Sequence, residues 1–187
     1  MSPTTAPAVQ ARTTWQIDPA HSLVEFSVRH MMVSTVKGRF TRFSGAILDV
    51  AEDPSLSSVQ VEIDPSSITT GDEQRDAHLR SADFFNAGAH PVIAFKSTRI
   101  EGTRDRFKVI GDLTLHGETR EIVLDAEFNG LGTNPWGKRV AGFSAETKLN
   151  RKDFGLNWNV ALEAGGVLVS DTIKVQIELQ AVERPAE

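Results

Sequence analysis

The sequence predicts an all-β domain in which eight antiparallel strands close into a barrel, with one short helix between the third and fourth strands. Three observations support this fold class. Apolar and polar side chains alternate strictly in several segments, which is the period of a half-buried strand. Turn-forming residues separate these segments, and only residues 70–81 break the alternation in the manner of a helix. The strands are long, and closure into a barrel removes the edges that they would otherwise expose.

The central feature is a predicted hairpin over residues 107–128. Val109 and Leu113 share the apolar face of the first arm, and Ile122 and Leu124 share that of the second. Gly117 lies between the arms, where it can adopt the positive φ of a tight reversal. An isolated hairpin is only marginally stable, so the other strands must wrap around it. The second arm is predicted to end at the loop of residues 129–137, NGLGTNPWG.

The other strands are expected at residues 22–30, 37–50, 59–63, 91–100, 138–149 and 171–182. A short extended segment, residues 15–17, precedes the first of them, and Gly45 predicts an irregularity within 37–50. The short helix is expected within residues 70–81, where acidic residues near its start interact favourably with the helix dipole. Residues 151–166 are expected to be irregular.

Length and composition restrict the class of protein. The 187 residues fit one domain, predicted over 13–184 after a disordered tail of residues 1–12. A net charge of -5 argues against binding nucleic acid or an anionic membrane surface. Cysteine is absent, which excludes a thiol nucleophile and a cysteine zinc site. The N-terminus lacks the pattern of a secretory signal and no run could span a membrane, so a cytoplasmic protein without a transmembrane segment is predicted.

Catalytic and metal-binding patterns are weak. No G-x-S-x-G motif is present, and the adjacent His21 and Ser22 do not indicate a catalytic dyad. The histidines are scattered along the chain, so they are expected to cap or bridge elements, although a site assembled in three dimensions from histidines and carboxylates stays an alternative. No catalytic residue, metal or cofactor is predicted.

Five segments in order carry a family resemblance: WQIDPAHSLVEFSVRHM, KGRFTRFSG, RDAHLRSADFF, GDLTLHGETR and RKDFGL. Together they resemble the YceI-like family over roughly residues 15–182. The resemblance implies a lipocalin-like barrel whose apolar pore holds a long isoprenoid or another amphiphilic lipid. Many family members are exported to the periplasm, and this chain lacks the expected signal.

The predicted ligand-binding residues are mostly large apolar side chains of the barrel. They are Val24, Phe26, Val28, Phe40, Phe43, Phe84, Phe85, Phe95, Leu113, Leu115, Phe128, Phe143 and Trp158. Such side chains either fill a core or line a pocket, and the sequence does not separate the two. Small inward residues such as Ala126 and Ala145 favour an open lumen.

Three polar residues complete the predicted site: His30, Arg75 and His78. His30 shares the apolar parity of its strand, so it is expected either to seal the barrel or to bind a lipid head group. Arg75 either meets the head group or, with Asp76, pins the helix onto the barrel.

The leading hypothesis is a carrier or sequestering protein for a long-chain isoprenoid, such as a quinone or prenyl phosphate, or for a fatty-acid-like lipid. One alternative is an isomerase or hydrolase that uses His30 and an acidic residue on a lipid substrate. Another is a ligand-free interaction module that pairs as a homodimer through its barrel surface.

Overall fold

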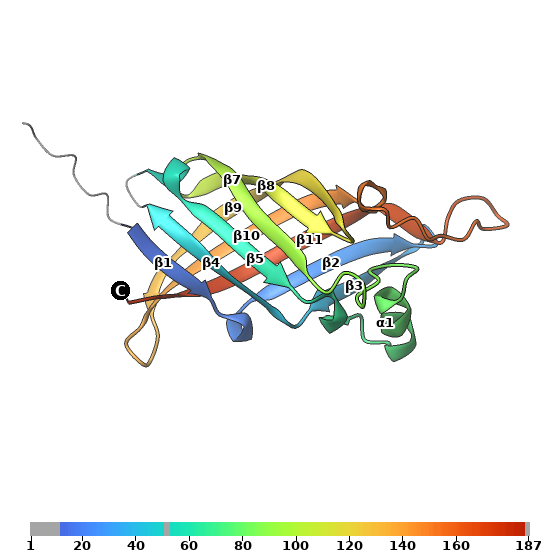
Figure 1. Ribbon diagram of the computed structural model, residues 1–187, viewed down its shortest axis with the longest axis horizontal. Coiled ribbons are helices and arrows are strands. Elements are labelled where there is room, and N and C mark those ends of the chain that lie inside the picture. The colour runs from blue at the N-terminus through green and yellow to red at the C-terminus, as the bar shows by residue number, and fades with distance from the viewer. Residues whose placement is uncertain (1–11, 51–52, 186–187) are drawn as a thin grey trace, which may run out of the picture.

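The computed structural model describes residues 12–50 and 53–185, and within them all strands belong to one antiparallel sheet (Figure 1). The predicted tail, residues 1–12, lies outside the described residues except for Arg12, which begins β1. Within the described ranges, no helix has the length and apolarity needed to cross a membrane.

Eight strands close the sheet into a barrel, as the sequence predicts. In order around the ring they are β1 (Arg12–Ile17), β4 (Phe43–Val50), β5 (Ser58–Ile63), β7 (Ile93–Gly102), β8 (Arg106–Leu115), β9 (Glu118–Thr133), β10 (Arg139–Asn150) and β11 (Val169–Glu183). β1 pairs with β4 on one side and with β11 on the other, which closes the ring.

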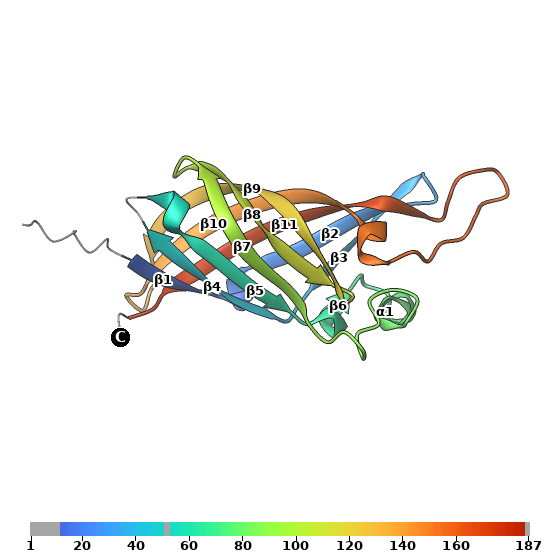
Figure 2. The ribbon, with the colours of Figure 1, turned by 45° about the horizontal axis from the view of Figure 1, so that its top comes forward.

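Three further segments extend the barrel at one end (Figure 2). They are β2 (Leu23–His30), β3 (Ser34–Phe40) and β6 (Ile68–Thr69), which pair in the order β11, β2, β3, β6. β1 and β2 both pair with β11, at successive stretches of that strand. The pairs β1 and β2, β3 and β4, and β5 and β6 therefore act as three long strands, each interrupted once.

An Asp-Pro pair begins each of three short 3₁₀ helices between strands, with the aspartate as N-cap and the proline as first helical residue: η1 (Pro19–His21), η2 (Pro54–Leu56) and η3 (Pro65–Ser67). In each case the aspartate side chain accepts a hydrogen bond from a backbone N–H of the first turn. Proline suits the first helical position because its fixed φ matches and its missing N–H would have no partner there. Asp18-Pro19 and Asp64-Pro65 directly follow the last residues of β1 and β5.

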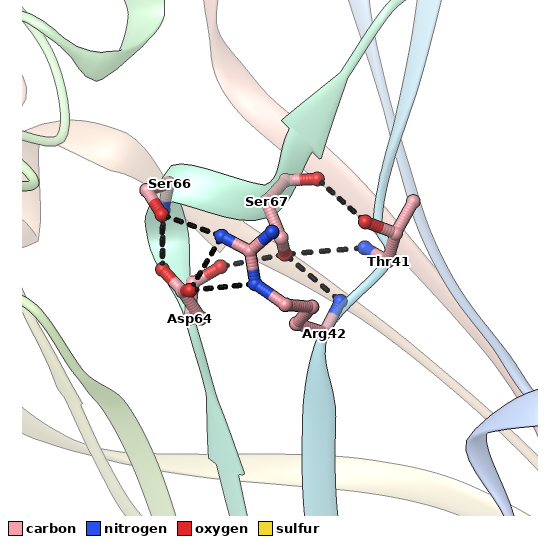
Figure 3. A network of polar contacts seen from close by, with 5 residues as sticks. All are labelled: Thr41, Arg42, Asp64, Ser66 and Ser67. Atoms are coloured by element: carbon pink, nitrogen blue, oxygen red, sulfur yellow. Dashed lines mark hydrogen bonds and ion pairs between the residues drawn. The ribbon is translucent and has the colours of Figure 1, made fainter.

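The expected strand 37–50 is interrupted at Thr41 and Arg42, between β3 and β4, and not at Gly45 (Figure 3). The Ser67 hydroxyl accepts hydrogen bonds from the N–H groups of both interrupting residues, at 3.1 and 3.0 Å. Phe40 and Phe43 are three positions apart, and an unbroken strand would place them on opposite faces. The interruption lets both side chains point into the barrel, where both are buried.

Gly45 instead pairs regularly with Val61. A Cβ atom at this position would lie 2.5 Å from the Gln60 carbonyl oxygen. The glycine therefore serves a close approach of backbone, which is the other common reason for glycine in a strand.

Asp64 anchors the same interruption through its side chain (Figure 3). It accepts a hydrogen bond of 2.6 Å from the Ser66 hydroxyl and bonds of 2.9 and 2.8 Å from Nε and Nη2 of Arg42. The hydrogen bond from Ser66 has the largest effect, and together with the Arg42 guanidinium it holds the pKa of this carboxyl below its ordinary value. Burial acts in the opposite direction.

The central hairpin joins β8 to β9 through His116 and Gly117, with φ of 55° and 78°. Positive φ at both central residues is the signature of a type I′ turn, whose twist matches the flanking strands. The expectation that the second arm ends at Phe128, before a loop of residues 129–137, is wrong. β9 continues to Thr133 past a register shift opposite Gly142 and Phe143, which absorbs the extra residue as a bulge.

The helix α1 (Glu73–Arg80) lies between β6 and β7, as expected, and begins after the N-cap Asp72. β7 begins two residues later than predicted, after Pro91, which has no N–H for a ladder. The irregular segment after β10 begins with the short helix η4 (Arg151–Phe154). In Figure 1, α1 and this segment lie at one end of the barrel, and the β7–β8 turn and η2 lie at the other.

Candidate functional site

The barrel encloses a cavity of about 290 Å³ that runs between its inward faces. A buried site for one water molecule needs only about 10–15 Å³ on a comparable measure. The lumen is therefore lined rather than filled, which is the distinction that the sequence leaves open.

Twelve of the sixteen predicted ligand-binding residues line this cavity. They are Val24, Phe26, Val28, Phe40, Phe43, Phe84, Phe85, Phe95, Leu113, Leu115, Phe128 and Phe143. The small residues Ala126 and Ala145 also line it and lie opposite each other in the register of β9 and β10. Whether these side chains contact a ligand stays a prediction.

His30, Arg75, His78 and Trp158 lie outside the lining. His30 is half-buried at the last position of β2, opposite Ser34 of β3 and Val169 of β11, beyond the closed ring. His30 lies on the same face of β2 as the residues that line the cavity. At the end of β2, however, the strand lies beyond the closed part of the barrel.

Arg75 has the hydrogen bonds expected of the pinning alternative. Its Nε donates to the Thr70 hydroxyl at 2.7 Å and its Nη2 donates to the Thr70 carbonyl at 3.0 Å. The Thr70 hydroxyl in turn donates to the buried Asp76 carboxylate at 2.6 Å, and the Thr70 N–H donates to the same oxygen. This chain of bonds fixes α1 to the segment that follows β6.

His78 and Trp158 support the lining from outside. The His78 ring stacks edge-on against Phe84 and Trp158, with centroid distances of 5.1 and 4.8 Å, and its Nε2 lies 2.8 Å from Asp83. Phe84 lines the cavity, so the aromatic cluster of these three rings holds it in place at the α1 end. Such edge-to-face contacts stabilise beyond the area that they bury.

Sequence reasoning missed the buried Arg151 of η4, whose side chain is 3% exposed and lines the cavity. Its guanidinium donates to four backbone carbonyls, those of Leu156, Trp158, Val169 and Ser170, at 2.6 to 3.3 Å. The pKa of Arg151 is lowered, because the effect of burial exceeds the opposing effect of the Asp171 carboxylate at 3.5 Å. A charged residue in an irregular segment is usually exposed, so its motif RKDFGL was the only signal in the sequence.

Arg151 joins the two arms of the segment 155–170. Phe154, the last residue of η4, and Leu156 of this segment are 2% and 6% exposed and lie on the cavity wall. The α1 end of the cavity is thus covered by well-packed side chains.

The opposite end carries more exposed lining residues. Asp49 at the end of β4 and Arg104 in the β7–β8 turn form an ion pair with a 3.5 Å N–O distance. The Arg104 guanidinium lies over the Phe128 ring, 5.2 Å from its centroid. Leu131 of β9 also lines the cavity and is 50% exposed. We call this the rim of the cavity, formed by Asp49, Arg104, Phe128 and Leu131.

His21, His90 and His116 contact neighbouring groups in the described part of the chain. His21 lies 2.8 Å from Asp18, and the His116 ring contacts both the Phe154 carbonyl, at 3.1 Å, and the ring of His90. Among residues 12–50 and 53–185, no group of three or more histidine and carboxylate side chains is arranged to hold a metal ion.

These features define a closed antiparallel β-barrel with an apolar internal cavity, a class that can enclose one small ligand. Comparison with known proteins then identifies the family. A family model described as the YceI-like domain matches residues 15–181, so the chain belongs to the YceI-like family.

The similar proteins span most of the chain. A UPF0312 protein of Staphylococcus aureus (strain N315) is 41% identical over 165 residues, covering 88% of this chain and 94% of the relative. The crystal structure of BcnA from Burkholderia cenocepacia superposes with a TM-score of 0.76 at 22% identity, covering 88% of this chain and 98% of BcnA. A polyisoprenoid binding domain from Saccharophagus degradans gives 0.68 at 18% identity, covering 91% and 98%. At these identities the two structures show a shared fold.

Proposed function

We propose that this protein binds a long-chain isoprenoid or a similar amphiphilic lipid in the barrel cavity, and that it carries or sequesters that lipid. The observation that carries the proposal is the cavity of about 290 Å³, lined almost entirely by aliphatic and aromatic side chains. Pockets of this composition take apolar ligands and orient them with a few polar groups. The structural relative named for polyisoprenoid binding supports the same ligand class.

The size of the cavity sets the length of chain that it can hold. An apolar cavity of about 150 Å³ binds one benzene molecule, so about twice that volume accommodates on the order of a dozen carbon atoms. A longer chain would extend into the rim or require lining side chains to move. Burying about twelve CH₂ groups gains roughly 10 kcal/mol at about 0.8 kcal/mol each. Association costs about 4–15 kcal/mol, so the tail alone gives weak to moderate affinity.

The two alternatives are less well supported. The enzyme alternative depends on His30, which is absent from the cavity lining. The ligand-free module requires a lumen occupied by its own side chains, and the cavity argues against that.

Mass spectrometry of the purified protein tests the proposal, first in the native state and then after organic extraction. We expect a hydrophobic species in about equimolar amount with the protein. If the protein is purified without a bound lipid, it is titrated with isoprenoid quinones and prenols. We then expect one-to-one complexes in native mass spectra. A bare protein that also binds none of these compounds would refute the carrier function.

A further inference from the structure

Most polar side chains on the cavity wall are already engaged within the protein. Those with a hydrogen bond or an ion pair are Glu25, Asp49, Ser57, Arg104, Ser144 and Arg151. Thr147 of β10 also lines the cavity, and its hydroxyl has no hydrogen-bond partner among the described residues. A hydroxyl both donates and accepts hydrogen bonds, and at Thr147 both capacities are available to a ligand.

The Thr147 hydroxyl is accessible from the cavity. Thr147 lies between Ala145 and Leu149 on the inward face of β10, and all three residues line the cavity. The indole N–H of Trp15 also lacks a hydrogen-bond partner, but it is fully buried, whereas the Thr147 hydroxyl is not. A ligand can therefore reach Thr147 directly, while it could reach the Trp15 N–H only if the wall moved.

Small side chains leave space beside this hydroxyl. Ala145 precedes Thr147 on the inward face of β10 and lies opposite Ala126 of β9. On the other side, Thr147 pairs with Val175 of β11, which also lines the cavity. The wall around the hydroxyl therefore carries no large ring on β10 or β11.

Phe26 of β2 is the next residue around the wall at this level, because it pairs with Val175. Its ring leans the other way, toward β3. A Cβ atom on Gly38 of β3 would lie 2.4 Å from Cζ of Phe26, and the Phe26 and Phe40 ring centroids are 5.7 Å apart. Since Gly38 pairs with Phe26 on the side of β2 away from β11, this ring does not take up the space over Val175 and Thr147.

These surroundings suit an uncharged polar group. Ala145, Leu149 and Val175 are apolar, so an anionic head beside Thr147 would lose its water without gaining a counter-ion, which costs far more than burying a neutral group that finds a hydrogen bond. The cation of the wall at the α1 end, Arg151, donates to four backbone carbonyls. The other cation of the wall, Arg104, lies at the rim.

We propose that the Thr147 hydroxyl binds the polar head of the lipid inside the cavity, that this head is an uncharged oxygen group such as a hydroxyl or a carbonyl, and that the tail runs from there toward the rim. This inference rests on the proposed lipid-binding function. The direction of the tail follows from the two ends of the cavity. Phe154 and Leu156 are buried at the α1 end, whereas Leu131 at the rim is 50% exposed. A tail longer than the cavity can therefore leave over Leu131.

The test compares two probes with the same farnesyl tail, farnesol and farnesyl phosphate. Their dissociation constants are measured at fixed salt concentration by the change in tryptophan fluorescence, because Trp15 lines the cavity. The wild-type chain should bind farnesol at least about tenfold more tightly than the phosphate. Thr147→Val removes the hydroxyl and should weaken farnesol at least about fivefold, since it leaves the head without a partner. The phosphate should change less than about twofold, because its charged head stays in water at the rim.

Two further variants isolate the hydrogen bond. Thr147→Ser keeps the hydroxyl and should bind farnesol within about twofold of the wild-type chain. Thr172→Val is the matched control, since Thr172 is an exposed threonine of β11 outside the cavity lining. It should leave both dissociation constants unchanged.

The direction of the tail has its own test. Leu131→Asn should weaken the binding of geranylgeraniol, whose tail is longer than the cavity, by at least about threefold. The shorter geraniol, which fits within the cavity, should change less than about twofold. An equal loss for the two alcohols would show that the tail does not leave over Leu131.

The outcomes separate this subsite from the proposed function. If Thr147→Val binds farnesol as the wild-type chain does, or weakens both farnesyl probes equally, or if the wild-type chain prefers the phosphate, the subsite at Thr147 is wrong while the lipid-binding function stands. If neither probe binds and no other prenol or quinone does, the proposed function itself is refuted. Thermal melting checks that each variant is folded, which we expect because valine and serine both resemble threonine in size.

Discussion

Replacing Arg151 by Met should destabilise the protein strongly. The side chain is 3% exposed, and its guanidinium donates to four backbone carbonyls that lie on both arms of the segment 155–170. Each buried carbonyl left without a donor costs about 1–3 kcal/mol. Local opening will let water reach some of these groups, so we expect a loss of about 3–5 kcal/mol in the free energy of unfolding rather than the full sum. This is a large fraction of the roughly 5–15 kcal/mol that stabilises a typical domain.

The assay is urea unfolding followed by circular dichroism, together with amide hydrogen exchange. Exchange should accelerate first between Leu156 and Val169, because the guanidinium holds the two arms of that segment together. Lys152→Met is the matched control, since Lys152 is exposed and its ammonium forms an ion pair with Asp171 at 3.2 Å. Exposed ion pairs contribute about 0–1 kcal/mol, so this variant should be nearly neutral. An Arg151→Met protein as stable as the control, with unchanged exchange in the segment, would show that the carbonyls do not depend on the arginine.

Three further outcomes are expected. Ala145→Phe should lower isoprenoid affinity at least tenfold, measured by titration followed by tryptophan fluorescence, with little loss of stability. The reason is that a benzene-sized ring takes up about half of the cavity. Unchanged binding would place the ligand elsewhere. Gly45→Ala should cost about 1–3 kcal/mol in urea unfolding, because its Cβ would lie 2.5 Å from the Gln60 carbonyl oxygen; a neutral effect would mean that β4 and β5 separate easily. The lowered pKa of Asp64 adds stability that is present above the unfolded-state pKa, near 3.8, and is lost as pH falls through the lower folded-state value. Asp64→Asn should therefore flatten the stability profile below about pH 4, and an unchanged profile there would contradict the contribution of Ser66 and Arg42.

The strands were predictable because each has one face on the interior. Val24, Phe26 and Val28 alternate with polar residues, and the pattern survives whatever the neighbouring strand is. The interruption at Thr41 and Arg42 was not predictable, because the hydroxyl that replaces the strand pairing comes from Ser67, far along the chain. Local patterns carry no information about such a partner.

The polar part of the site was harder to predict, for a related reason. The candidate polar residues were chosen by parity or by position in the helix, and Arg75 turned out to be engaged by its near neighbour Thr70. Arg151 and Arg104 lie in irregular segments, where no period indicates which side chains face inward. Their positions follow from long-range contacts, Arg151 with Val169 and Ser170, and Arg104 with Asp49 and Phe128.

An eight-stranded barrel has an interior just wide enough either to be filled by side chains or to hold one small ligand. The number of strands therefore does not decide whether the interior is filled or open; the volume of the inward side chains at each level of the wall does. Ala126 and Ala145 face each other across β9 and β10, so two neighbouring strands give up volume at the same level. Larger rings line other parts of the wall: Phe84 lies beside α1, Phe128 beneath Arg104, and Phe107 opposite Ala126 on β8. Neither alanine alone would leave enough space for a ligand. Because the strand register places the two opposite each other, the space that each leaves adds to the same part of the lumen.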